Sequence, residues 1–237
     1  MKQLVLDLQL PAPPSFENFI RGENAELLYQ LGCWSLGEGD VRFLYLWGER
    51  GSGKSHLLAA ARAMLPAGAQ IFFTDAAYDA LPSSLPQEAS LIVDNVEALS
   101  RDEQIRLFDH FNTLKDGGGL LLAAGSKPPM LLLLRPDLST RLGWGLVYQL
   151  KPLSDPEKAD ALKRRAFSLG FELSDDLADY LLRHASRDLP TLYQHLDIAN
   201  HLSLTEKRPV TASLLREVIR GIGQSKPELG ESSDFFR

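Results

Sequence analysis

Short apolar runs alternate with amphipathic stretches through roughly the first two thirds of the chain. The apolar runs cover residues 43–47, 70–74, 91–94, 119–124 and 146–150. Continuous apolar runs of this length are typical of strands that are buried on both faces. Helical patterns lie between them, most clearly over residues 55–65 and 101–114. The alternation predicts an α/β unit in which a parallel five-stranded sheet is sandwiched by helices.

The pattern changes after residue 153, because residues 154–222 show only helical periodicity. Ser154 and Glu157 have the spacing of a capping box, and Pro156 falls in the first turn. Further helices are predicted to begin near Ser174 and Thr211, with a third helix between them. These marks predict a compact bundle of about four helices.

A phosphate-binding motif follows the first apolar run directly. It comprises Gly48, Glu49, Arg50, Gly51, Ser52, Gly53, Lys54 and Ser55, and it matches G-x-x-x-x-G-K-[ST] in full. The glycines let several backbone N–H groups point into one concavity, and the helix that follows adds its positive dipole end. Lys54 is the predicted cation for the outer phosphates, and the Ser55 hydroxyl is a predicted Mg²⁺ ligand. The motif and its strand–helix context together argue against a chance glycine-rich turn.

A second acidic element is expected at the end of a neighbouring strand. Residues 91–94 end in Asp94, a predicted Mg²⁺ ligand, and Asn95 stands where many hydrolysing proteins of this class carry a second acid. An amide does not take a proton from water. Glu97 is close in sequence, but its offset of two residues leaves its direction open. We therefore expect a site that binds nucleotide and hydrolyses it slowly on its own.

Five stretches together resemble AAA+ proteins of the DnaA type, and among them the Hda-type DnaA-related regulators. The stretches are residues 16–22, 48–55, 91–97, 138–145 and 187–189. The resemblance spans most of the chain, and its most specific part after the phosphate loop is the Arg-Leu-Gly-Trp-Gly segment at 141–145. It implies an AAA+ fold with an α/β nucleotide-binding domain at 16–153 and a small all-α lid domain at 154–222. Residues 223–237 are expected to be a loose tail.

The resemblance also implies roles for particular residues. Arg141 corresponds to an arginine finger that acts in trans on nucleotide held by another subunit, although composition alone favours an ordinary surface residue. Arg187 corresponds to the second sensor arginine. Ser126 either orients water or phosphate or caps the following turn. The implied cofactors are ADP or ATP with Mg²⁺, and the other candidate nucleotide contacts are Phe16, Phe19, Ile20 and His56.

The amino-terminal segment, residues 1–15, combines alternating leucines with a proline-rich linker. Gln3, Leu4, Leu6 and Leu8 resemble the short peptide with which replication proteins dock on the bacterial sliding clamp, the β subunit of DNA polymerase III. A chance match in a leucine-rich chain is the alternative. Exposed leucines on a tail need a partner, and an extended peptide in an apolar groove would supply one.

Composition bears on the partners. The chain has 237 residues, a formal net charge of −6 and one cysteine. The negative net charge argues against direct DNA binding, so contact with DNA is expected only indirectly, through the clamp. The single cysteine fits the cytoplasm, and no run is long enough to span a membrane.

The preferred function is negative regulation of replication initiation, with DnaA and the clamp as partners and a homodimer or homo-oligomer as the expected assembly. The alternatives are a self-hydrolysing AAA+ ATPase, such as a helicase loader, and a nucleotide-gated clamp adaptor that has no finger.

Overall fold

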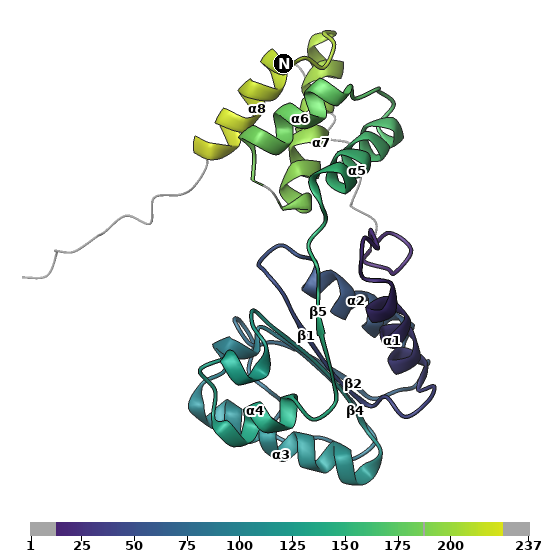
Figure 1. Cartoon of the computed structure of the whole chain (residues 1–237), viewed down its shortest axis with the longest axis vertical. Helices are drawn as coiled ribbons and strands as arrows, with labels where there is room; N and C mark the ends of the chain where they lie inside the picture. Colours follow the sequence, from purple (N-terminus) through teal and green to yellow (C-terminus); the bar gives the residue numbers. More distant parts are fainter. Residues whose placement is uncertain (1–12, 187, 225–237) are drawn as a thin grey trace, which may run out of the picture. The chain divides into compact units, whose positions relative to one another are not determined.

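The computed structural model describes residues 13–186 and 188–224 of the chain. The described residues fall into two compact units that divide between Leu153 and Ser154 (Figure 1). The candidate residues Gln3, Leu4, Leu6, Leu8 and Arg187 lie outside the described residues. None of the described helices is both long and apolar enough to cross a membrane.

The first unit is a parallel sheet covered by helices on both faces. Its elements in chain order are α1 (Ala25–Leu36), β1 (Phe43–Trp47), α2 (Lys54–Met64), β2 (Ile71–Asp75), β3 (Ser90–Asp94), η1 (Val96–Ala98), α3 (Arg101–Gly117), β4 (Leu120–Gly125), η2 (Pro129–Leu131), α4 (Pro136–Leu142) and β5 (Leu146–Gln149). The strand order is β2-β3-β4-β1-β5, and every neighbouring pair is parallel. The predicted five-stranded parallel sheet is therefore confirmed.

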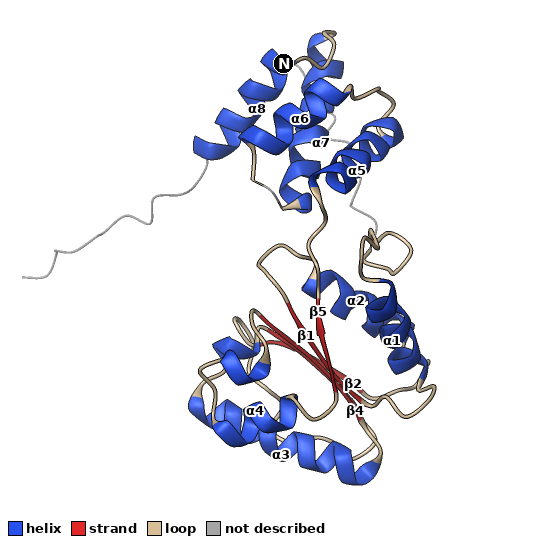
Figure 2. Cartoon of the chain, in the orientation of Figure 1, coloured by secondary structure: helices blue, strands red, loops and turns tan. Residues whose placement is uncertain are grey.

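Alternating side chains of β1 divide the core of this unit in two. Leu44 and Leu46 pack with residues of α1 and α2, whereas Tyr45, between them, packs with residues of α3 and α4. Figure 2 shows the same division, with α1 and α2 on one side of the sheet and α3 and α4 on the other. Because successive residues of a strand point to opposite faces, one short strand contributes to both layers. The helix that follows the phosphate loop, α2, and the helix α4 consequently lie on opposite faces of the sheet.

The second unit is a helical bundle. It contains α5 (Asp155–Ser168), α6 (Asp175–His184), α7 (Leu189–Glu206) and α8 (Ala212–Gln224) within the described residues. Their apolar faces form one cluster of buried leucines and alanines. The predicted capping box is present, since the Ser154 hydroxyl accepts from the Glu157 N–H and the Glu157 carboxylate accepts from the Ser154 N–H. The bundle predicted from the helical periodicity is confirmed.

Candidate nucleotide-binding site

The phosphate loop connects β1 to α2 and leaves backbone donors free at the start of the helix. Gly51 and Gly53 have φ angles of 77° and 101°, which side chains rarely allow. Gly53 is the N-cap of α2, and no side chain caps its N–H groups. A Cβ on Gly53 would also lie 2.8 Å from the Phe19 ring. Uncapped N–H groups at a helix amino terminus form a site for an anion.

Lys54 lies within this loop. Its side chain is 9% exposed, and Nζ donates to the carbonyl oxygens of Gly48 at 2.8 Å and Glu49 at 3.0 Å. Burial lowers the pKa of Lys54, while the carboxylates of Asp94 and Glu97 oppose that shift. The Ser52 hydroxyl is buried and has no hydrogen-bond partner among the residues that the structure describes. A buried cation, an orphaned hydroxyl and uncapped amides together fit a polyphosphate group.

Asp94 and Ser55, the two predicted Mg²⁺ ligands, contact each other directly. The Ser55 hydroxyl donates to one Asp94 oxygen, and the Asn95 N–H donates to the other at 2.9 Å. Burial raises the pKa of Asp94, and these two hydrogen bonds act against the shift. Among the described residues no three carboxylate, imidazole or thiol groups converge as a metal site. The pair therefore fits a Mg²⁺ ion that takes its remaining ligands from phosphate and water.

Residues 15–20, which precede α1, lie against the phosphate loop. Phe16 and Phe19 pack with the core on the α1–α2 side, and Ile20, which follows them, is half-buried. The ring centroids of Phe19 and His56 are 5.5 Å apart, and His56 Nε2 is 2.9 Å from the Ser15 carbonyl oxygen. The structure thus brings Phe19 and His56 together beside Gly53, where a planar base would find apolar contacts.

Asn95 faces away from the phosphate loop toward the edge strand. It has a left-handed backbone conformation, with φ of 54°, and its side-chain amide donates to Asp75 at 2.8 Å. Sequence reasoning did not identify Asp75 as its partner, because the contact depends on β2 and β3 being neighbours. This hydrogen bond gives Asn95 a role in joining the ends of β2 and β3.

Glu97, whose direction the sequence left open, reaches the end of β4. Its Oε1 accepts from the Ser126 N–H at 3.1 Å. On the other side of the same loop, the Tyr45 hydroxyl donates to the Lys127 carbonyl oxygen at 3.0 Å. Burial, and then the charge of Glu97, raise the pKa of Tyr45. The loop that carries Ser126 is therefore held by Glu97, whose direction the sequence left open, and by Tyr45, which the sequence analysis did not single out.

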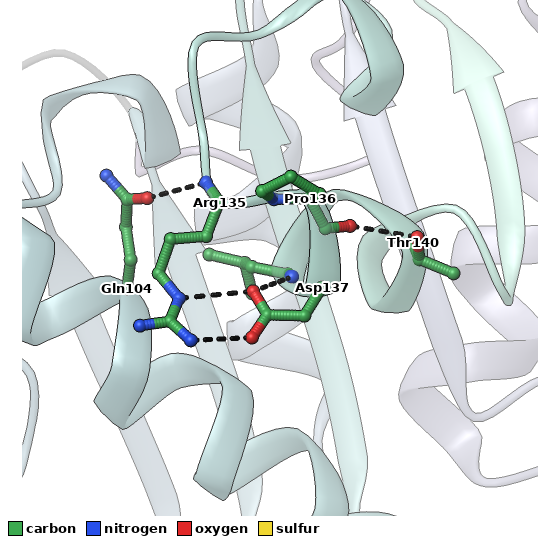
Figure 3. Close-up of polar contacts among 6 residues, drawn as sticks. Gln104, Arg135, Pro136, Asp137 and Thr140 are labelled. Carbon is green, nitrogen blue, oxygen red and sulfur yellow. Dashed lines mark hydrogen bonds and ion pairs between the residues drawn. The ribbon is translucent and has the colours of Figure 1, made fainter.

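The start of α4 is fixed by polar contacts (Figure 3). The Arg135 N–H donates to the Gln104 side chain of α3 at 2.9 Å, and the Arg135 guanidinium pairs with Asp137 through bonds of 3.1 and 2.7 Å. Thr140 donates to the Pro136 carbonyl oxygen at 2.9 Å. A bidentate guanidinium–carboxylate pair restricts the geometry of both side chains. These contacts fix the amino-terminal end of α4, the helix that carries Arg141.

Arg141 lies among aromatic rings near the end of α4. Its guanidinium carbon is 5.5 Å from the ring centroids of Phe108, Phe111 and Trp144. The guanidinium forms no hydrogen bond or ion pair with any residue that the structure describes. Phe108 and Phe111 lie on α3, about 30 residues before Arg141, so local sequence pattern does not predict this arrangement. The rings hold the cation and leave its donors free.

Gly145 allows the segment after Arg141 to approach the beginning of β1. A Cβ at this position would lie 2.0 Å from the Phe43 carbonyl oxygen. Phe43 begins β1, whereas the phosphate loop follows Trp47 at its other end. Four residues of strand separate these ends by about 13 Å. The Arg141 segment therefore lies toward the amino end of the sheet, away from this chain's own phosphate loop.

Comparisons with known proteins cover both units. Residues 155–219 match the family model described as "Hda, lid domain". The structure is similar to domain III of the replication initiation protein DnaA from Thermotoga maritima, with a TM-score of 0.73 and 18% identity. That likeness covers 92% of this chain and 99% of the other.

Two further solved structures show the same fold. AMPPCP-bound DnaA from Aquifex aeolicus has a TM-score of 0.66 and 21% identity, covering 92% of this chain and 72% of the other. The RuvB Holliday junction branch migration motor of Thermotoga maritima has a TM-score of 0.66 and 18% identity, covering 88% and 72% respectively. At these identities the likeness shows the fold, which is that of an AAA+ module.

Proposed function

Because the chain is an Hda-type, DnaA-related AAA+ protein, we propose that it lowers replication initiation by stimulating hydrolysis of the ATP held by DnaA. Arg141 is the arginine finger in this proposal, and it acts in trans. A guanidinium beside a transferring phosphoryl group stabilises the charge of the transition state, and such a finger contributes about 10³–10⁵ in rate.

The placement of Arg141 is the observation that carries the proposal. Its guanidinium has no carboxylate partner among the described residues, and its helix packs on the face of the sheet opposite α2. It also lies toward the amino end of β1, near Phe43. An arginine so placed is well removed from its own phosphate loop. It is free to bind phosphate on another subunit.

The chain's own nucleotide, ADP or ATP, is proposed to bind at the phosphate loop. The loop amides and Lys54 bind the phosphates, and Phe19 and His56 pack against the base. Mg²⁺ held by Ser55 and Asp94 would neutralise phosphate charge.

Asn95 is engaged by Asp75 and carries no carboxylate, so we propose weak intrinsic hydrolysis. Ser126 would contribute to the outer phosphate position, and Arg187 would bind phosphate from the lid.

Docking on the DNA-loaded sliding clamp is the second part of the proposal. The amino-terminal peptide with Gln3, Leu4, Leu6 and Leu8 would occupy an apolar groove of the clamp. Contact with DNA would then be indirect, in keeping with the net charge of −6. We place the protein in the cytoplasm, as a homodimer or homo-oligomer in its resting state.

The test is single-turnover hydrolysis of DnaA-bound ATP, with and without this protein and DNA-loaded clamp. The wild-type chain should accelerate phosphate release, and Arg141→Ala should remove the acceleration by about 10³-fold. Arg101→Ala is the matched control, because Arg101 is an exposed arginine at the start of α3. An Arg141→Ala protein that stimulates as well as the wild type would exclude the finger and favour a nucleotide-gated clamp adaptor.

Deletion of residues 1–10 tests the docking peptide separately. We expect the deleted chain to lose clamp affinity while it retains its nucleotide affinity, because the phosphate loop is untouched. Unchanged clamp affinity would exclude the peptide. Turnover of ATP by the purified chain alone, at the rate of a vigorous ATPase, would instead favour a self-hydrolysing protein such as a helicase loader.

A further inference from the structure

A second cation lies on the same ring as Arg141. The Lys115 Nζ is 3.7 Å from the centroid of the Trp144 ring, and the Arg141 guanidinium carbon is 5.5 Å from the same centroid. So short a distance places the Lys115 ammonium over the face of the ring, because the ring atoms exclude such an approach from the edge. Trp144 is 51% exposed. The ring that joins the two cations is therefore at the surface.

Lys115 is free of anionic partners in the part of the chain that the structure describes. It is the basic residue in the last turn of α3, where the helix dipole favours a cation. Its ammonium forms no hydrogen bond or ion pair with a described residue, and the exposed Asp116 that follows it is not paired with it. Like the Arg141 guanidinium, the Lys115 ammonium keeps its donors available.

The position of Lys115 is fixed by its neighbours. The Arg42 guanidinium donates to the Lys115 carbonyl oxygen at 3.4 Å, and its carbon lies 5.6 Å from the centroid of the Phe43 ring. The ring centroids of Phe43 and Phe111 are 4.6 Å apart, and those of Phe111 and Trp144 are 5.6 Å apart. This row of rings joins β1, α3 and the residues after α4, and it holds the two free cations at one place.

Two free cations on one ring favour a ligand with several negative charges. A polyphosphate presents anionic oxygens on neighbouring groups, so one molecule can bind both cations, whereas a single carboxylate is a poorer match. The Lys115 ammonium already covers a face of the Trp144 ring. This argues against a nucleobase stacked on that face and favours the phosphates as the part of a ligand that binds here.

We propose that Lys115 acts in trans together with Arg141, and that both bind the phosphates of a nucleoside triphosphate held by another subunit. The inference rests on the proposed function and adds a second phosphate-binding residue to the finger. The planar guanidinium donates in a fixed fork, whereas the ammonium is a mobile point charge that reaches a different oxygen. Because Lys115 contacts the phosphates, it contributes to the rate of hydrolysis within the complex.

The experiment is single-turnover hydrolysis of DnaA-bound ATP at increasing concentrations of the full chain, with DNA-loaded clamp present. Lys115→Met keeps an unbranched side chain on the Trp144 ring and removes the charge. It should lower the maximal rate about 10–100-fold and change the half-saturating concentration less than about threefold, because a charge-assisted hydrogen bond to phosphate is lost. Lys115→Arg keeps the charge and should restore most of the rate.

Two controls accompany these variants. Arg101→Met removes a cation from the other end of α3, about 20 Å away, and should leave the maximal rate unchanged. The affinity of each variant for its own nucleotide should equal that of the wild type, which shows that the variant is folded.

A maximal rate of Lys115→Met within twofold of the wild-type rate, with Arg141→Ala inactive, would overturn the inference and leave the proposed function intact. A loss confined to the half-saturating concentration would also overturn it, since Lys115 would then contact the protein surface of the other subunit and not its nucleotide. Failure of Lys115→Arg to restore the rate would assign Lys115 to packing on Trp144 instead. Full stimulation by Arg141→Ala would refute the proposed function itself.

Discussion

Lys54 and Arg141 are the two cations on which the proposed function depends, and their surroundings differ in kind. Lys54 is 9% exposed and donates to two carbonyl oxygens of its own loop. Arg141 is half-buried among three rings, and its guanidinium donates to no described residue. A ligand phosphate at Lys54 must replace existing hydrogen bonds, whereas one at Arg141 breaks none.

Arg135, a third cation, shows more clearly how the surroundings of Arg141 differ from those of a structural arginine. Arg135 is the N-cap of α4, the helix that carries Arg141, and its guanidinium donates two hydrogen bonds to Asp137 (Figure 3). At the two ends of α4, therefore, Arg135 stabilises the start of the helix and Arg141 is left available to another molecule. Aromatic rings hold a cation without occupying its donors, which is what a residue that acts on another molecule requires.

The largest expected effect comes from removing Lys54. Lys54→Ala should weaken the chain's own nucleotide affinity about 100-fold, because charge-assisted hydrogen bonds to phosphate are lost. Arg141→Ala should leave that affinity within twofold of the wild-type value. Calorimetric titration of both variants checks the contrast. Equal losses in the two would show that Arg141 serves its own site, against the proposed action in trans.

Gly145→Ala tests the close backbone approach of the Arg141 segment to the start of β1. The added Cβ would meet the Phe43 carbonyl oxygen, and relief of that overlap should lower the free energy of unfolding by about 1–3 kcal/mol. Gly32→Ala in α1 is the control, because nothing lies within 4 Å of its Cβ, and it should stabilise by about 0.5–1 kcal/mol. Urea unfolding measures both, and a neutral Gly145→Ala would contradict the close approach.

Trp144→Ala should have a smaller effect, confined to the finger. It removes a single ring that contacts both Arg141 and Lys115, whose Nζ lies 3.7 Å from the ring centroid. Since a cation–π contact contributes about 0.5–2 kcal/mol, stimulation of DnaA should fall about 3–30-fold. Trp144→Phe keeps a ring and should restore most of the activity. Failure of phenylalanine to restore it would point to a role other than ring contact.

The smallest expected effect is on Asp137. Its hydrogen bonds with the Arg135 guanidinium hold the pKa of Asp137 below its usual value, so the ionised carboxylate stabilises the fold above about pH 4. As pH falls through the lowered pKa, that contribution disappears. Asp137→Asn should therefore reduce the melting temperature slightly near pH 7, and the difference from wild type should vanish at low pH. A difference that grows on acidification would contradict this pairing.

The sequence predicted what depends on local pattern. The phosphate loop, the parallel sheet and the Ser154 capping box follow from glycine spacing, apolar runs and the N3 glutamate. It did not predict α1 or α4, and it left the strand order open. The open strand order explains why the Asn95–Asp75 and Ser126–Glu97 contacts were not predicted, since each joins residues at the ends of neighbouring strands. The site roles assigned to Arg141, Asn95 and Ser126 stay predictions.

Because the side chains of β1 alternate between the two faces of the sheet, β1 tolerates substitutions better than insertions or deletions. Substitutions at Leu44 or Leu46 alter the volume of one layer and leave the other in place. A deletion or insertion of one codon within β1 would exchange the faces, since the side-chain repeat is two residues. The Tyr45 hydroxyl would then leave the Lys127 carbonyl oxygen, its present acceptor. We expect related chains to vary in β1 by replacement and to keep its length.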